Sequence, residues 1–184
     1  MENRIIIAGS GGQGILFLGK LICRAAMIEE RNVTWFPSYG AEMRGGTANC
    51  TVVISTELIG SPIVKTPDSM IILNQASMDK FRSCIANDGN LYYDSSLISD
   101  SVTRDNISAF AIPSSRIAGK LGNPRLSNMV LLGAFIISSH LISTDSVKQA
   151  LKIIIPEERS ALIEKNITAI EKGMEFAENQ KSKD

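Results

Sequence analysis

The chain has 184 residues, of which 44% are hydrophobic and 21% are charged. This average composition excludes a wholly disordered or collagen-like protein, and the length allows one domain with its own core. The 19 Lys and Arg residues balance the 19 Asp and Glu residues, so the composition offers no basic surface for a nucleic acid or an anionic membrane.

The reactive side chains are few. Three cysteines cannot assemble a four-thiolate cluster, and Cys23, Cys50 and Cys84 form no Cys-x-x-Cys pair, so we expect packed, reduced thiols and no metal on this chain. The single histidine, His140, is expected to be a partly packed helix residue, and no catalytic residue is assigned. The longest apolar run is too short for a membrane span, and the N-terminus carries no secretion signal, so we expect a cytoplasmic protein.

Strands and helices alternate over the first two thirds of the chain. We expect buried strands where short β-branched or apolar runs are bounded by Gly, Pro or Asp, and helices where apolar residues recur at helical spacing. The expected strands cover 4–8, 33–36, 49–55, 70–73, 91–93 and 109–112, and the expected helices cover 15–28 and 77–86.

The last third favours three helices, over 125–141, from Thr144 and over 158–178. The last of these carries an apolar stripe that would pack on the sheet or on another subunit, formed by Ile163, Ile167, Ile170, Met174 and Ala177. We therefore predict one Rossmann-like α/β domain over residues 1–178, with a mostly parallel sheet flanked by helices, a helical C-terminal third and a polar tail over 179–184.

A glycine-rich turn follows the first expected strand and matches the pattern G-x-G-x-x-G through Gly9, Gly11, Gly12, Gln13 and Gly14. In this context, backbone amides can approach a phosphate at a helix N-terminus. The position about 20 residues further on, where a dinucleotide site has a ribose-binding carboxylate, falls at Phe36-Pro37-Ser38. Three alternatives stay open: an NAD or flavin site, a site for another anion, and glycines needed only for packing.

A second glycine-bounded stretch is a candidate interface or ligand loop, and it contains Tyr39, Gly40, Glu42, Arg44, Gly45 and Gly46. An internal ion pair between Glu42 and Arg44 would shape this loop. Alternatively, Arg44 would clamp an anion or dock on a partner, since its guanidinium binds carboxylate or phosphate with two hydrogen bonds.

With these motifs the sequence resembles the gamma subunit of 2-oxoacid:ferredoxin oxidoreductases. The resemblance rests on the Gly9 to Gly14 turn, on Pro37 to Gly46 and on short motifs that extend to Gly173, and it covers essentially the whole chain. The amino-acid sequence from Thr34 to Cys50 is most similar to that of the 2-oxoglutarate enzyme.

The resemblance implies a Rossmann-like subunit of a complex that converts a 2-oxoacid to an acyl-CoA and passes electrons to ferredoxin. It implies that thiamine diphosphate and Mg lie on alpha and beta chains, that iron-sulfur clusters lie on other chains including a ferredoxin-like delta chain, and that coenzyme A accepts the acyl group. The gamma chain would be mainly structural, with the Gly9 to Gly14 turn as a candidate contact for coenzyme A phosphates. The alternatives are the pyruvate or branched-chain enzyme, and a nucleotide-binding oxidoreductase or regulatory module that acts alone.

Overall fold

A six-stranded mixed sheet forms the centre of the computed structural model, which describes residues 1–38, 47–99, 102 and 104–181. The strand order is β2-β3-β1-β4-β5-β6, and β3 alone among these six runs against its neighbours. The strands are β1 (Glu2–Ser10), β2 (Asn32–Ser38), β3 (Thr47–Ser55), β4 (Ser69–Ile72), β5 (Gly89–Asp94) and β6 (Ile107–Ile112).

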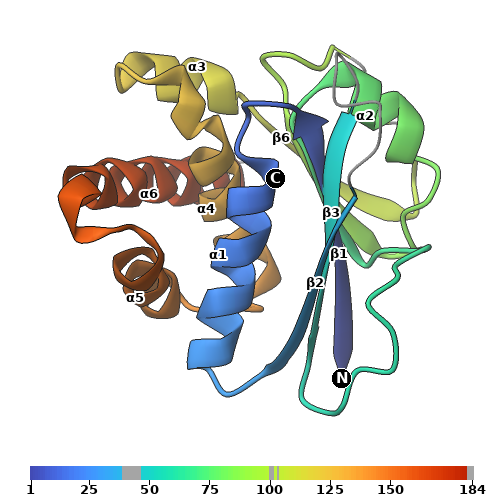
Figure 1. Cartoon of the computed structure of the whole chain (residues 1–184). Helices are drawn as coiled ribbons and strands as arrows, with labels where there is room; N and C mark the ends of the chain where they lie inside the picture. The colour runs from blue at the N-terminus through green and yellow to red at the C-terminus, as the bar shows by residue number, and fades with distance from the viewer. Residues whose placement is uncertain (39–46, 100–101, 103, 182–184) are drawn as a thin grey trace.

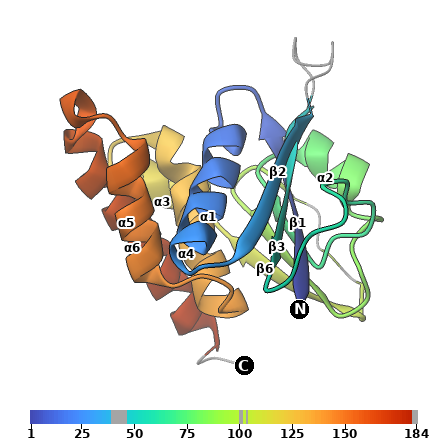
Figure 2. The same ribbon diagram turned by 60° about the horizontal axis from the view of Figure 1, so that its bottom comes forward.

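Helices cover both faces of the sheet unequally (Figure 1). One face carries α1 (Ile15–Ile28), α3 (Ser114–Lys120), α4 (Ser127–Ser139), α5 (Thr144–Ile154) and α6 (Ala161–Lys181). Within this layer α1 and α4 lie on the strands, α5 packs on α1, and α6 packs mainly on α4 with a smaller contact to β6. The opposite face carries α2 (Gln75–Phe81) (Figure 2). In the described part of the chain, no helix is both long and apolar enough to cross a membrane.

The two cores follow from side-chain alternation along the strands. On β1, Ile5 and Ile7 point to the large helical layer, while Ile6 and Ala8 point to the α2 face. All four are buried. Burial on both faces explains why β1 reads as a continuous β-branched run, which is typical of a central strand in an α/β sheet.

The expected fold class is confirmed, with local corrections. The sequence missed α3, so four α-helices rather than three follow residue 113 in the described part of the chain. The second expected helix ends early, because α2 stops at Phe81 instead of Ala86. β2 runs on to Ser38 through Pro37, which is tolerated because β2 lies at the edge of the sheet.

The C-terminal helix differs in extent and in packing partner. It covers residues 161–181 rather than 158–178, because 157–159 form a separate 3-10 turn after Pro156. The buried side of α6, which includes Ala169, Ile170 and Ala177, packs mainly on α4. The apolar stripe is therefore covered within this chain, mainly by a helix rather than by the sheet.

His140 does not lie within a helix. It is the C-cap residue of α4, with φ of 53°, and it is exposed. The left-handed conformation ends the helix two residues before the expected end, Leu141, in a position where Gly is more common.

Candidate functional site

The glycine-rich turn lies at the carboxyl end of β1, in the centre of the sheet. β1 pairs with antiparallel β3 on one side and with parallel β4 on the other, so the strand connections diverge at this point. In open α/β sheets, ligands bind at the carboxyl ends of parallel strands where the chain connections diverge. The fold therefore places the turn at the edge where a ligand site is expected.

Gln13 ties the turn to the neighbouring strand. Its side-chain Oε1 accepts a hydrogen bond from the Ser10 amide at 2.6 Å, and its Nε2 donates to the Leu73 carbonyl oxygen at 3.1 Å. Leu73 directly follows β4. Gln13 thus has a positioning role in this structure, because both ends of its side-chain amide are bound within the chain.

Asn74 links the same edge to the other face of the sheet. Its Nδ2 donates to Ser10 Oγ at 2.5 Å, while its Oδ1 accepts from the Ser77 amide at 3.0 Å and caps the N-terminus of α2. One side chain therefore holds the end of β1 and the start of α2 together.

Asn128 holds the far side of the turn. Gly14 is the N-cap of α1 in the left-handed conformation, with φ of 72° and no side-chain cap. Asn128 Nδ2 donates to the Gly14 carbonyl oxygen at 3.3 Å, and a Cβ at Gly14 would overlap this amide. Gly14 is therefore required by packing and by backbone conformation together.

The five residues that the sequence assigns to anion binding divide into two groups. Gly9, Gln13 and Gly14 are used within the fold, since a Cβ at Gly9 would lie 2.7 Å from Gln13 Oε1 and from Ile15 Cδ1. Gly11 and Gly12 are different. A Cβ at either meets no described atom within 4 Å, and only Gly12 has a positive φ, of 88°.

Polar groups beside the turn suit an anion more than a metal. Thr47 pairs with Ser10 across the strands, and Lys80 Nζ lies 3.5 Å from Thr47 Oγ1. The side chains that hold the turn are hydroxyls and amides, with a lysine nearby. Among the described residues, no group of three His, Cys, Asp or Glu residues is placed to hold a metal ion.

The buried thiols are poor nucleophiles. Burial raises the pKa of both the Cys23 and Cys50 thiols to about 12. Cys23 donates to the Thr34 carbonyl oxygen and Cys50 to the Ile15 carbonyl oxygen, each at 3.7 Å. Both cysteines serve packing between α1 and the sheet, as the sequence predicts.

The second expected site, containing Tyr39, Gly40, Glu42, Arg44, Gly45 and Gly46, lies outside the described residues. Its flanking residues are placed. Ser38 pairs with Asn49, and Thr47 pairs with Ser10, so the chain leaves and re-enters the sheet at the edge that carries the glycine turn.

Sequence reasoning missed the roles of Asn74, Asn128 and Lys80 at this edge. For Asn74 a signal was present, because it follows the expected strand 70–73 and parallel strands end at a common edge. No sequence spacing relates Asn128 to Gly14, which lies 114 residues away.

Comparison with known proteins identifies the family. The model of the pyruvate ferredoxin/flavodoxin oxidoreductase family matches residues 4–176. The ketoisovalerate oxidoreductase subunit VorA of Methanothermobacter thermautotrophicus is 40% identical over 96% of this chain and 36% of its own length. The 2-oxoglutarate synthase subunit KorC of Methanocaldococcus jannaschii is 34% identical over 96% of this chain and 95% of its own length. The chain thus spans about a third of the first relative and nearly all of the second.

Two solved structures have the same fold. The gamma subunit of a keto/oxoacid ferredoxin oxidoreductase from Geobacter sulfurreducens superposes with a TM-score of 0.81 at 28% identity, over 95% of this chain and 98% of that one. The 2-oxoglutarate:ferredoxin oxidoreductase from Magnetococcus marinus, solved with 2-oxoglutarate, coenzyme A and succinyl-CoA bound, gives 0.86 at 26% identity, over 97% of this chain and 31% of that one. The resemblance to gamma subunits seen in the sequence is confirmed, and the chain belongs to the pyruvate ferredoxin/flavodoxin oxidoreductase family.

Proposed function

We propose that this chain is the gamma subunit of a cytoplasmic 2-oxoglutarate:ferredoxin oxidoreductase, in which 2-oxoglutarate is oxidatively decarboxylated to an acyl-CoA with electrons passed to ferredoxin. The observation that carries this proposal is the end-to-end match to a 2-oxoglutarate synthase subunit, 96% of this chain against 95% of the relative. The likeness to a solved 2-oxoglutarate enzyme supports the same assignment.

The small number of reactive side chains supports a role as one subunit among several. The described residues contain no three-ligand metal group, and two of the three cysteines are buried with raised pKa values. Oxidative decarboxylation takes its difficult chemistry from cofactors. We therefore assign thiamine diphosphate, Mg and the iron-sulfur clusters to alpha, beta and delta partner chains, and ferredoxin to the role of acceptor.

Two relatives carry this domain within a longer chain. The matching region makes up 36% of a ketoisovalerate subunit and 31% of a chain in the solved 2-oxoglutarate enzyme. In those proteins one polypeptide joins the domain to further sequence, which supports a place for this domain beside other parts of such an enzyme.

A branched-chain 2-oxoacid enzyme is the second candidate, because the ketoisovalerate subunit has higher identity to this chain, 40% against 34%. Co-expression with the partner chains tests both candidates. The purified complex is assayed for reduction of ferredoxin or methyl viologen with 2-oxoglutarate, 2-oxoisovalerate or pyruvate, each with coenzyme A.

A preference for 2-oxoglutarate is expected from the complex, and none of the three substrates should be turned over by this chain alone. A preference for 2-oxoisovalerate or pyruvate would show that 2-oxoglutarate is not the substrate of the complex. Turnover by the isolated chain would overturn the subunit role.

Within this function, we assign the open part of the turn, at Gly11 and Gly12, to contact with a phosphate of coenzyme A. Their amides form no hydrogen bond to a described residue, and a Cβ at either position would meet no described atom within 4 Å. Helix N-termini and exposed glycine amides can bind a phosphate even where the protein has no carboxylate to bind the ribose. Gly9, Gln13 and Gly14 make contacts within the fold. These contacts support the alternative that the turn serves only strand-helix packing.

Gly11→Ala separates these two alternatives. A Cβ at Gly11 meets no described atom, and φ is not positive there, so the folded chain should tolerate the methyl group. If the turn contacts coenzyme A, the substitution raises the KM for coenzyme A in the assembled complex and leaves the KM for the 2-oxoacid unchanged. Gly60→Ala, at an equally open glycine, is the control. Unchanged kinetics would assign the turn to packing.

For the stretch containing Glu42 and Arg44 we propose an interface role. Arg44→Ala should weaken assembly with the partner chains more than it weakens folding, because a bidentate donor at an interface leaves its partner unpaired when it is removed. Co-purification of the subunits and the melting temperature of the isolated chain measure the two effects. Equal recovery of the complex would count against the assignment.

A further inference from the structure

A cavity of about 340 Å³ lies between α3 and α6, on the large helical layer. We call it the α3–α6 cavity, and its lining comprises Ile117, Lys120, Leu121, Lys172, Glu175, Phe176 and Asn179. It shares no residue with the glycine turn. Its volume falls within the range of small-molecule sites, about 300–1,000 Å³.

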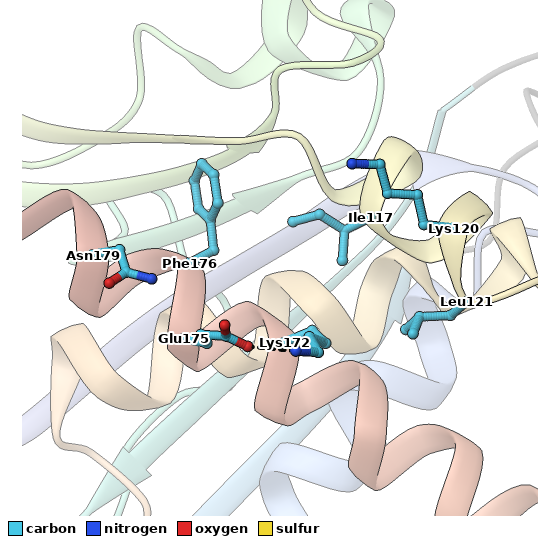
Figure 3. Close-up of a pocket in the computed structure, with 7 residues that line it drawn as sticks. All are labelled: Ile117, Lys120, Leu121, Lys172, Glu175, Phe176 and Asn179. Carbon is cyan, nitrogen blue, oxygen red and sulfur yellow. Dashed lines mark hydrogen bonds and ion pairs between the residues drawn. The ribbon is translucent and has the colours of Figure 1, made fainter.

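The apolar walls come from both helices. Ile117 belongs to α3, Leu121 is the C-cap residue that follows it, and Phe176 belongs to α6 (Figure 3). All three are partly buried and pack against the main core, so their positions are set by the fold rather than by a ligand. A small apolar group would therefore find preformed walls.

The charges around the cavity are unbalanced. The one carboxylate of the lining, Glu175, is bound by Lys172 at 2.6 Å. Lys120 has neither an ion pair nor a hydrogen bond to any described residue. The rim therefore carries one uncompensated positive charge, and Asn179 adds a side-chain amide on the α6 side.

The helix end does not account for Lys120. A lysine in a last turn often stabilises free carbonyl groups. At the end of α3, however, backbone amides already bind these carbonyls. Leu121 donates to Ile117 and Ala118, and Gly122, with φ of 79°, donates to Gly119. The ammonium group is left without a structural partner.

We propose that the α3–α6 cavity binds a small amphipathic anion, a monocarboxylate with a short alkyl or aryl body. The body lies between Ile117, Leu121 and Phe176, and the carboxylate pairs with Lys120. A helical partner segment fits less well, because helix-in-groove binding needs a row of apolar anchors along two or more turns. Here the apolar part is a single cluster of three side chains.

Titration of the full ¹⁵N-labelled chain with hexanoate and with hexan-1-ol tests the proposal, since the two probes share the alkyl body and differ in charge. Saturable shifts of the amide resonances of Leu121 and Phe176 are expected with hexanoate. Hexan-1-ol should bind about tenfold more weakly, because the charge-assisted contact is lost. Equal affinity for the two probes, or shifts confined to other regions, would overturn the proposal.

Lys120→Gln is the matching variant, and Lys165→Gln on α6 is its control, because both lysines are exposed and lie outside the core. Only Lys120→Gln should remove the preference for hexanoate. A preference retained in Lys120→Gln would exclude this lysine as the carboxylate partner and overturn the assignment.

Lysine acetylation measured by mass spectrometry in the free chain and in the assembled complex distinguishes a small ligand from a protein partner. Lys120 should react equally in both when no anion is added, and hexanoate should slow its reaction. Protection of Lys120 by assembly alone would overturn the small-ligand proposal and assign the cavity to a subunit contact.

Discussion

Gly133 on α4 and Gly173 on α6 bring the backbones of these two helices into direct contact. A Cβ at Gly133 would overlap the carbonyl oxygen of Ile170, and a Cβ at Gly173 would overlap that of Val130. The obstacle in each case is backbone, which cannot rotate away as a side chain can. The crossing of α4 and α6 therefore depends on two positions without side chains.

We predict that Gly133→Ala or Gly173→Ala lowers the free energy of unfolding by roughly 3 kcal/mol, because the helices must move apart in a close-packed core. Urea denaturation of the isolated chain measures this loss. Gly119→Ala on α3 is the matched control, since a Cβ there meets no described atom. It should be neutral or stabilising by up to about 1 kcal/mol, from helix propensity. A cost for Gly133→Ala no larger than that of the control would refute the close crossing.

Gly14 and Asn128 should show strong energetic coupling. Gly14→Ala introduces both an overlap with the Asn128 side chain and a left-handed alanine, and Asn128→Ala removes only the first of these. The double variant should therefore be more stable than the sum of the single effects predicts, by about 1 kcal/mol or more.

Gly12→Ala provides the reference for backbone strain alone, because Gly12 has φ of 88° and no described atom near its Cβ position. Its cost should be about 1–2 kcal/mol. The double-mutant cycle is measured by urea unfolding of the wild type, Gly14→Ala, Asn128→Ala and the double variant. Strictly additive effects would contradict the contact between Gly14 and Asn128.

Glu29 is expected to make the free energy of unfolding depend on pH. Partial burial alone would raise the pKa of its carboxyl group, but hydrogen bonds from the Ser143 amide and the Ser146 hydroxyl, with the nearby Arg31 charge, hold the pKa below its ordinary value of 4.5. Both bonds are 2.7 Å long and fix the start of α5. The ionised form is therefore favoured by folding.

A lowered folded-state pKa stabilises the protein above the unfolded pKa, and this contribution is lost as the pH falls through the folded value. At neutral pH, Glu29→Gln should be less stable than the wild type by about 1 kcal/mol, a figure reduced for solvent screening. The difference should shrink as the pH falls below 4.5. Unfolding curves of both proteins across this range measure it, and a difference independent of pH would argue against an ionic contribution.

The three thiols should react at different rates. Cys23 and Cys50 are buried with pKa values raised to about 12, whereas Cys84 is partly exposed. Iodoacetamide at neutral pH should label Cys84 first in the native chain, and should label the other two only after unfolding, because the thiolate is the reactive form. Mass spectrometry of labelled peptides follows each site. Labelling of Cys23 as fast as Cys84 would mean that α1 opens from the sheet.

Patterns that act over a short stretch predicted most of the fold. The β-branched run at Ile5 to Ile7 and the glycines after it predicted a buried strand, a turn and a helix, all of which the structure contains. Apolar spacing likewise predicted the stripe on α6. Such patterns report local conformation and which side of an element is buried, since these depend on residues a few positions apart.

Contacts between distant segments were beyond these patterns. The sequence could not tell that α4, rather than the sheet, covers the α6 stripe, because an apolar stripe does not specify its partner. Helix α3 was missed because its seven residues, SSRIAGK, contain two serines and a glycine, which favour turns in isolation. The split of the glycine turn into packed and open positions depends on Asn128, which only the folded chain brings close.

The antiparallel direction of β3 has a consequence for how this family can vary. β2 ends at Ser38 and β3 begins at Thr47 on the same margin of the sheet. The two anchor points of the connection are therefore neighbours, and strand pairing fixes their positions whatever the number of residues between them. We expect that a change in the length of this connection leaves the register of β1, β2 and β3 in place.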